Sequence, residues 1–311
     1  MASPADRIFT GVDLTKKGLT FQSGHDAAAL KTYRYLRLGM LVAVAALSYS
    51  IIEEYSQRGV HCFLGSISGY YYTPVHPVFI GVMVGIGLAL IVIKGRTAIE
   101  DACLSLAGMM APIVALVPTG DDVQGVCRQQ MLSAGRYQPD THGSFGPASI
   151  SNDMHAYVLA GYVAIGLLLI AALVEWRHSG SIEEYTTGTW ISLGIAFALV
   201  ITGSVLLRWG YGWVLQGHAR AACAMFLLLA VAAITNGVLG FLRQHTKRIY
   251  AWFYVAVGTF MIVAGIVFLA TQVSDRSALN GHLVFAIEIV EILAFVIFWA
   301  VQTVERWNDT V

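Results

Sequence analysis

Eight runs of apolar residues divide the chain, and each is long enough to cross the hydrocarbon core of a bilayer. A transmembrane helix needs about 20 mostly apolar residues, within a range of roughly 17–25. The pattern therefore predicts an all-α protein, a polytopic transmembrane helix bundle of about eight helices. The runs cover residues 38–55, 77–94, 102–118, 154–176, 189–207, 219–242, 249–271 and 282–303.

The polar segments between these runs set the expected organisation. Residues 1–37 are polar and partly basic, which predicts a flexible N-terminal arm, and residues 305–311 form a short tail. Residues 38–304 are expected to form a single bundle. Two segments outside the membrane are long, 56–76 and 119–153, and long polar loops of compact proteins often carry function.

The distribution of basic residues predicts the orientation of the bundle. With the N-terminus inside, 13 of the 19 lysines and arginines fall on the inner side. Because cytoplasmic segments of membrane proteins carry the excess of positive charge, both termini are expected to be cytoplasmic. We expect a multi-pass protein of the cell membrane, most simply the plasma membrane of a bacterium.

Composition agrees with a membrane protein and excludes some partners. Hydrophobic residues make up 57% of the chain, charged residues 12%, and the mean hydropathy is +0.66. Soluble domains carry roughly 25% charged residues. The net charge is zero, which argues against a nucleic-acid partner and leaves the lipid bilayer as the expected surrounding.

Four histidines each stand at the start of an even-numbered apolar run, and therefore on the same, outer side of the membrane: His76, His155, His218 and His282. The last three are 63 and 64 residues apart. A histidine at a helix N-terminus tends to stay neutral, which suits a metal ligand or a general base. His76 precedes a proline beside three tyrosines and is better read as an interface residue.

A zinc site is one possibility for the other three histidines. Zinc accepts three histidines with a carboxylate or a water, and Glu53, Asp121 and Asp122 are expected at the same level as His155, His218 and His282. Ser66 or Ser68 would then orient a substrate. The sequence has no local pair of ligands such as HExxH, so each histidine could instead cap its helix or mark the interface.

Two glutamates lie inside the last apolar run. Glu288 and Glu291 are three residues apart on one helical face, and charge at this depth is costly unless it has a function or a partner. They could form a proton relay, or they could pair structurally with Arg220 of the sixth run.

Two of the four cysteines fall in the long outer segments. Cys62 and Cys127 lie where disulfides persist, whereas Cys103 and Cys223 lie within apolar runs. A bridge between Cys62 and Cys127 would tie the outer segments together, and two unrelated free thiols are the alternative.

The motif Ser66-x-Ser68-x-Tyr70-Tyr71-x-Thr73 and the residues after it, to about residue 120, resemble a family of uncharacterised bacterial polytopic membrane proteins. Similarity in later runs is fainter, and the fourth and fifth runs look like an addition. No activity is assigned to that family, so the resemblance implies fold and location only.

A looser similarity is to the superfamily of alkaline ceramidases and progestin and adiponectin receptors, which use zinc-hydrolase chemistry in the membrane. It implies a site built from Ser66 or Ser68, Asp121 or Asp122, and the three histidines. This chain lacks the paired His-x-x-x-His of that superfamily's last helix.

The favoured hypothesis is a membrane protein with a polar outer pocket that binds, and could hydrolyse, a lipid-like or amphipathic substrate. If it is an enzyme, it would be a metal-dependent hydrolase. The alternatives are a proton-coupled transporter of small solutes that uses Glu288 and Glu291, and a non-catalytic scaffold or partner subunit.

Overall fold

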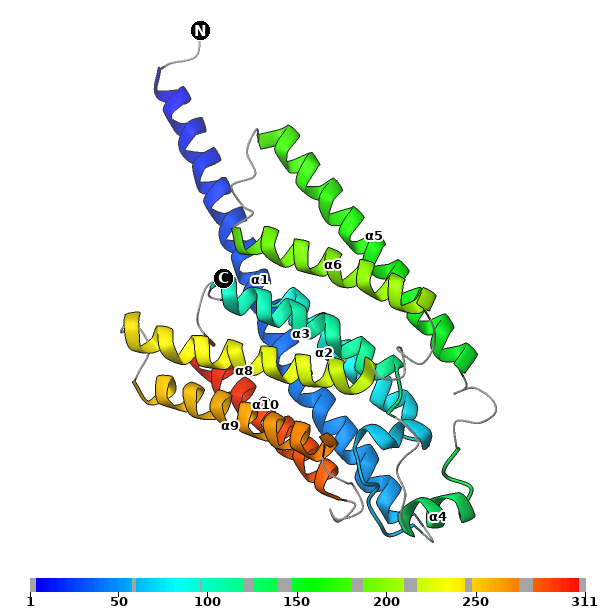
Figure 1. Ribbon diagram of the computed structural model, residues 1–311. Coiled ribbons are helices and arrows are strands. Elements are labelled where there is room, and N and C mark those ends of the chain that lie inside the picture. The colour runs from blue at the N-terminus through cyan, green and yellow to red at the C-terminus, as the bar shows by residue number, and fades with distance from the viewer. Residues whose placement is uncertain are drawn as a thin grey trace.

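The computed structural model describes an all-α protein, shown in Figure 1. It describes residues 4–57, 60–95, 97–119, 126–138, 147–179, 187–209, 217–243, 248–273 and 282–307. The α-helices are α1 (Pro4–Ser56), α2 (His76–Val92), α3 (Ala98–Leu116), α4 (Val126–Ser133), α5 (Pro147–Ser179), α6 (Thr187–Trp209), α8 (Gly217–Arg243), α9 (Arg248–Val273) and α10 (Leu283–Glu305), with a short 3₁₀ helix η1 (Ser68–Tyr72).

Within the described ranges, six helical segments are long and apolar enough to cross a membrane: Leu30–Ser56, Ala98–Leu116, Ala148–Val174, Gly217–Leu242, Arg248–Ala270 and Leu283–Glu305. Two further apolar segments are shorter, His76–Val92 and Leu193–Trp209. The polytopic helical architecture expected from the apolar runs is thus present, while the count of eight spans and the cytoplasmic side of both termini stay predictions.

The N-terminal segment is largely helical. Helix α1 begins at Pro4, so most of the segment 1–37 is continuous with the first span. The segment 119–153 also contains the eight-residue helix α4, which its polar sequence did not predict.

Local sequence explains where the core helices begin. Pro77 occupies the first turn of α2, where a missing backbone N–H costs nothing. Thr97 caps α3, because its side chain accepts a hydrogen bond from the Glu100 backbone N–H at 3.1 Å. The first turns of α2 and α3 are therefore stabilised by residues at the helix starts themselves.

Glycines allow the core helices to pack closely. A Cβ on Gly108 of α3 would lie 2.5 Å from the Gly87 carbonyl oxygen of α2, and one on Gly258 of α9 would lie 2.7 Å from the Ala230 carbonyl oxygen of α8. Small residues at such contacts are the usual means by which membrane helices approach each other. The chain thus builds two tight pairs, α2–α3 and α8–α9, and α3 joins them by packing on α8.

Helices α5 and α6 lie to one side of the remaining bundle (Figure 1). Only 11% of the apolar stretch of α5 is buried inside the protein, against 61% of the apolar stretch of α3. Both helices pack on each other and on α3. The centre of the molecule is therefore formed by α1, α2, α3, α8, α9 and α10.

Candidate functional site

The segment after α1 folds back over the start of α10. Phe63 stacks on Tyr55 of α1 at 4.5 Å and on Phe285 of α10 at 5.3 Å between ring centroids. The Phe285 backbone N–H donates to the Gly65 carbonyl oxygen at 2.9 Å. These contacts hold Ser66 and Ser68 against the first turns of α10.

The buried side chain of Tyr70 holds this segment together. Its side chain is fully buried, and burial raises the pKa of Tyr70 to about 12. The hydroxyl therefore stays protonated, and it accepts a hydrogen bond from the Leu64 backbone N–H at 3.4 Å.

Glu288 is held by donors from this segment. The hydroxyls of Ser66 and Ser68 lie 3.0 Å from its carboxylate oxygens, and the Ile67 backbone N–H donates to Oε2. Three residues far away in sequence thus face one carboxylate of α10. When Glu288 is ionised these are charge-assisted hydrogen bonds, which are the stronger ones in proteins.

His218, the second residue of α8, completes the cluster. The ring is buried, with Nδ1 at 2.6 Å from the Val117 carbonyl oxygen and Nε2 at 2.8 Å from Ser68 Oγ. We call His218, Ser66, Ser68 and Glu288 the outer polar cluster, after the side of the membrane that the sequence predicts for it.

Hydrogen-bond chemistry limits where its protons can be. A carbonyl oxygen only accepts, so the proton on His218 Nδ1 is committed to Val117. If His218 is neutral, Nε2 must accept from Ser68, and the contact between Ser68 and Glu288 then requires a proton on Glu288. If His218 is charged, Nε2 donates to Ser68, and Ser68 donates to an ionised Glu288. The two arrangements differ in the position of one proton, which Ser68 can relay.

A cavity of about 280 Å³ begins at this cluster. Its walls come from α1, α2, α3, α8, α9 and α10, and they are apolar except at Ser68, Glu288, Glu291 and the thiol of Cys223. Three lining residues, Leu227, Ile266 and Leu269, are more than half exposed on α8 and α9. In a bilayer these three residues would face lipid, and we call them the lipid-facing rim. The cavity is therefore mostly apolar and is open toward the lipid, whereas the sequence predicted a polar pocket open to the outer side.

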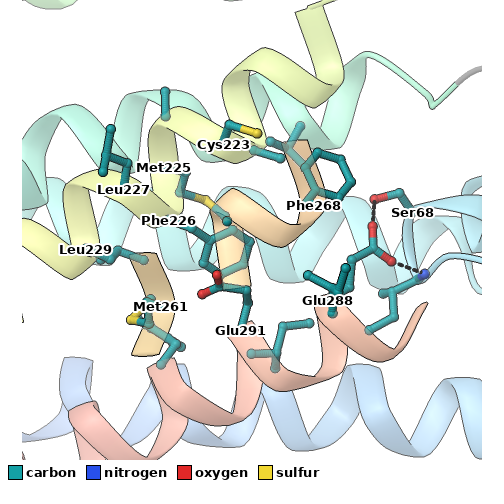
Figure 2. Close-up of a pocket in the computed structure, with 18 of the residues that line it drawn as sticks. Ser68, Cys223, Met225, Phe226, Leu227, Leu229, Met261, Phe268, Glu288 and Glu291 are labelled. Carbon is teal, nitrogen blue, oxygen red and sulfur yellow. Dashed lines mark hydrogen bonds between the residues drawn. The ribbon is translucent and has the colours of Figure 1, made fainter. Parts of the chain in front are cut away.

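Glu291 lies one helical turn deeper than Glu288, on the same side of α10. Figure 2 shows Glu288 turned toward Ser68, and Glu291 farther along the helix in the part of the cavity that holds Phe226. Its side chain is 3% exposed, and neither carboxylate oxygen has a hydrogen-bond partner among the described residues.

The remaining sequence-predicted residues do not join this cluster. His155 is exposed, and its Nδ1 lies 2.6 Å from the Ser151 carbonyl oxygen of its own helix. His282 is exposed at the start of α10 and makes no side-chain cap. Among the described residues no three histidine, cysteine, aspartate or glutamate side chains gather into a group that could hold a metal ion. The three-histidine zinc site is therefore not formed there.

The expected carboxylate partners also lie elsewhere. Glu53 is exposed and accepts a hydrogen bond from Gln57 at 3.0 Å. Asp121 and Asp122 lie outside the described residues. Arg220 is exposed and does not line the cavity, so Glu291 is not paired with it.

Interface and disulfide predictions can be placed as well. His76 Nδ1 lies 2.8 Å from the Tyr71 carbonyl oxygen, and the ring packs edge-on against Tyr71.

Cys62 and Cys127 form a disulfide with their Cα atoms 5.6 Å apart, which joins the segment after α1 to α4. Nearby, Arg136 pairs with Glu54 of α1 through two hydrogen bonds of 2.6 Å, and this contact raises the pKa of Arg136.

Sequence reasoning missed two parts of the site. The Val117 carbonyl that fixes the His218 ring has no signal in the sequence, because every residue carries a carbonyl. The pairing of Ser66 and Ser68 with Glu288 spans more than 200 residues, and no feature of the sequence pointed to it.

Comparison of the chain with protein-family models, with curated proteins and with solved structures finds no match. The functional argument therefore rests on the geometry of the cluster and the cavity.

Proposed function

We propose that the protein is an integral membrane protein of the cell membrane that binds a lipid-like or amphipathic molecule in the cavity between α2, α8, α9 and α10. The observation that carries this is the separation of chemistry inside one cavity. Its walls are apolar, and its polar groups collect along the first turns of α10. An amphipathic molecule has the matching division into an apolar chain and a polar head.

The dimensions favour a small ligand. Ligand pockets usually measure about 300–1,000 Å³, and this cavity, with about 280 Å³, is slightly smaller than that range. A molecule with one apolar chain fits better than a two-chain phospholipid. The lipid-facing rim on α8 and α9 gives such a molecule a route from the bilayer.

Photo-crosslinking in nanodiscs tests this function. The probe is dodecanol with a diazirine in its chain, and labelled peptides are mapped by mass spectrometry. We expect labelling within residues 222–229 and 287–295, which contain the cavity-lining positions of α8 and α10. Labelling that is no stronger there than on the lipid-facing side of α5 would rule the proposal out.

A cavity-filling variant sharpens the test. Gly265 lines the cavity, and a Cβ at this position would meet no atom within 4 Å. Gly265→Leu should therefore fill part of the cavity and lower cavity labelling several-fold. Gly166→Leu is the matched control, because Gly166 of α5 also has no atom within 4 Å and lies outside the cavity.

Hydrolysis of the bound molecule is a second candidate, favoured by the 2.8 Å contact between His218 Nε2 and Ser68 Oγ. In the neutral-histidine arrangement, Ser68 Oγ would attack an ester or amide carbonyl while His218 accepts its proton. The histidine would return that proton to the leaving alcohol or amine, and water would then release the acyl group from Ser68.

A fluorophosphonate probe separates hydrolysis from binding alone, because it reacts with activated serines. We expect covalent labelling of Ser68, which Ser68→Ala and His218→Ala abolish. Ser66→Ala is the matched control: Ser66 contacts Glu288 but has no contact with His218. A folded wild-type protein that the probe leaves unlabelled would exclude a nucleophilic Ser68 and leave the binding function standing.

A further inference from the structure

The two carboxylates of the cavity are in opposite states of hydrogen bonding. Glu288 faces the hydroxyls of Ser66 and Ser68 and the backbone N–H of Ile67. Glu291 has no partner for either oxygen among the described residues, although it is 3% exposed. The first is satisfied by the protein, and the second is not.

An unsatisfied carboxylate in an apolar site is costly. Burial of a polar group without a hydrogen bond costs about 1–3 kcal/mol by protein mutational data, and an isolated charge costs far more. Intramembrane carboxylates are accordingly found with a partner or on a functional pathway. No lysine, arginine or histidine lines the cavity, so the described part of the protein supplies no cation there.

The surroundings of Glu291 suit a positive group from outside the protein. Four phenylalanines line the same cavity, Phe79, Phe226, Phe268 and Phe295. The faces of aromatic rings attract cations, and the attraction is stronger where the cation is desolvated. An ammonium group beside Glu291 would thus meet a carboxylate and aromatic rings together.

We propose that Glu291 binds the ammonium group of a single-chain aliphatic amine, whose chain lies along the apolar wall of the cavity. This inference rests on the proposed binding function and names its ligand class. An ammonium group has three donors and no acceptor, which complements a carboxylate that only accepts. A phosphate-bearing head group is disfavoured, because it would place its negative charge beside Glu288 and Glu291.

The experiment compares two probes of equal length. One is dodecylamine and the other dodecanol, each with the same diazirine, applied to the full chain in nanodiscs of zwitterionic lipid. An alkylamine resembles a lysine side chain, whose pKa is about 10.4, so it is charged at neutral pH. We expect the amine to label the cavity several-fold more than the alcohol in the wild-type protein.

Substitution of Glu291 tests whether its carboxylate causes the preference for the amine probe. Glu291→Gln should bring amine labelling down to that of the alcohol, and alcohol labelling should persist, which shows that the cavity is intact. Glu53→Gln is the matched control, because Glu53 is exposed and lies outside the cavity. It should keep the preference for the amine.

The possible failures are distinguishable. Equal labelling of the wild-type protein by both probes, or a preference that survives Glu291→Gln, would overturn the amine inference and leave the binding function intact. Absence of cavity labelling by either probe would overturn the binding function itself.

Competition in the wild-type protein gives a second test that does not depend on a variant. Unlabelled dodecylamine should displace the amine probe several-fold better than dodecanol or dodecanoate does. Equal displacement by the three compounds would contradict a role for the Glu291 carboxylate, even if Glu291→Gln does not accumulate in the membrane.

Discussion

Buried polar side chains occupy both ends of α8 and α10, and the two ends are built differently. At one end the outer polar cluster faces the cavity. At the other, Glu100 of α3 lies 2.9 Å from Arg306 just after α10, with side chains only 1% and 2% exposed. Arg306 also donates to Asn236 of α8, and Gln302 donates to Glu100 at 3.0 Å. We call this group the closed polar cluster.

The closed cluster meets its charges with its own groups. Its glutamate has an arginine and an amide. Arg37, buried nearby, has no hydrogen-bond partner for its guanidinium among the described residues, but it lies over the rings of Tyr33 and Trp299 at 4.5 and 4.6 Å, and these ring faces attract its charge. None of these residues lines the cavity that begins at the outer cluster. The comparison teaches that burial of a charge does not identify a functional residue. What matters is whether the protein supplies the partner, and at Glu291 the described residues do not.

The largest expected effect is loss of stability at the closed cluster. Glu100→Gln leaves the Arg306 guanidinium buried without its countercharge, and removal of one partner of a buried ion pair typically costs about 3–5 kcal/mol. Unfolding in mixed micelles with increasing dodecyl sulfate, followed by far-UV circular dichroism, measures the change in free energy of unfolding.

A surface ion pair is the control for that measurement. Lys94 and Asp101 are 3.5 Å apart, and the lysine side chain is 60% exposed. Lys94→Gln should cost less than about 1 kcal/mol, since exposed pairs contribute little. Equal losses for Glu100→Gln and Lys94→Gln would show that the closed cluster is not structural.

The second largest expected effect is loss of stability when the disulfide at the outer end is removed. The disulfide between Cys62 and Cys127 closes a sequence separation of 65 residues. Its removal should cost about 2–4 kcal/mol, mainly because the unfolded chain gains freedom. The paired substitution Cys62→Ala with Cys127→Ala is compared with Cys103→Ala, a free cysteine. Unchanged stability of the double variant would mean that the outer segments are held by packing alone.

The third expected effect is loss of stability when the close contact between α2 and α3 is disturbed. Gly108→Ala would place a Cβ 2.5 Å from the Gly87 carbonyl oxygen, and the resulting shift of α2 against α3 should cost about 1–3 kcal/mol. Gly85→Ala is the control, since its Cβ would meet no atom within 4 Å. If both variants unfold at the same dodecyl sulfate fraction, the two helices are not in the tight contact described.

The helical architecture could be predicted from the apolar runs, and the reason is physical. A bilayer leaves a spanning chain few alternatives to a helix, so each of the eight runs overlaps a helix of the structure. Helix α4 escaped prediction because it is short and lies in a polar segment. Helix α1 runs through the polar residues of the expected arm into the first apolar run, because polar residues can extend a helix beyond its apolar part.

The site could be predicted only in part. Ser66, Ser68, His218 and Glu288 were all candidates, yet sequence could not show that they meet. In a helix that is apolar on every side, periodicity does not say which face is buried. His155, His218 and His282 stand at equivalent levels, and only His218 turns into the bundle. A zinc site needed all three to face the same point.

The smallest expected effect separates the two cavity glutamates. Where Glu288 is ionised, Glu288→Gln removes the negative charge that accepts from Ser66, Ser68 and Ile67, and loss of hydrogen bonds to a charged group should cost about 1.5–3 kcal/mol of unfolding free energy. Glu291→Gln breaks no described hydrogen bond and removes an unpaired carboxylate. Its unfolding free energy should therefore be unchanged or slightly higher, while its preference for the amine probe is lost. A loss at Glu291→Gln as large as that at Glu288→Gln would mean that the protein itself supplies a partner for Glu291, and the outer end would then resemble the closed one.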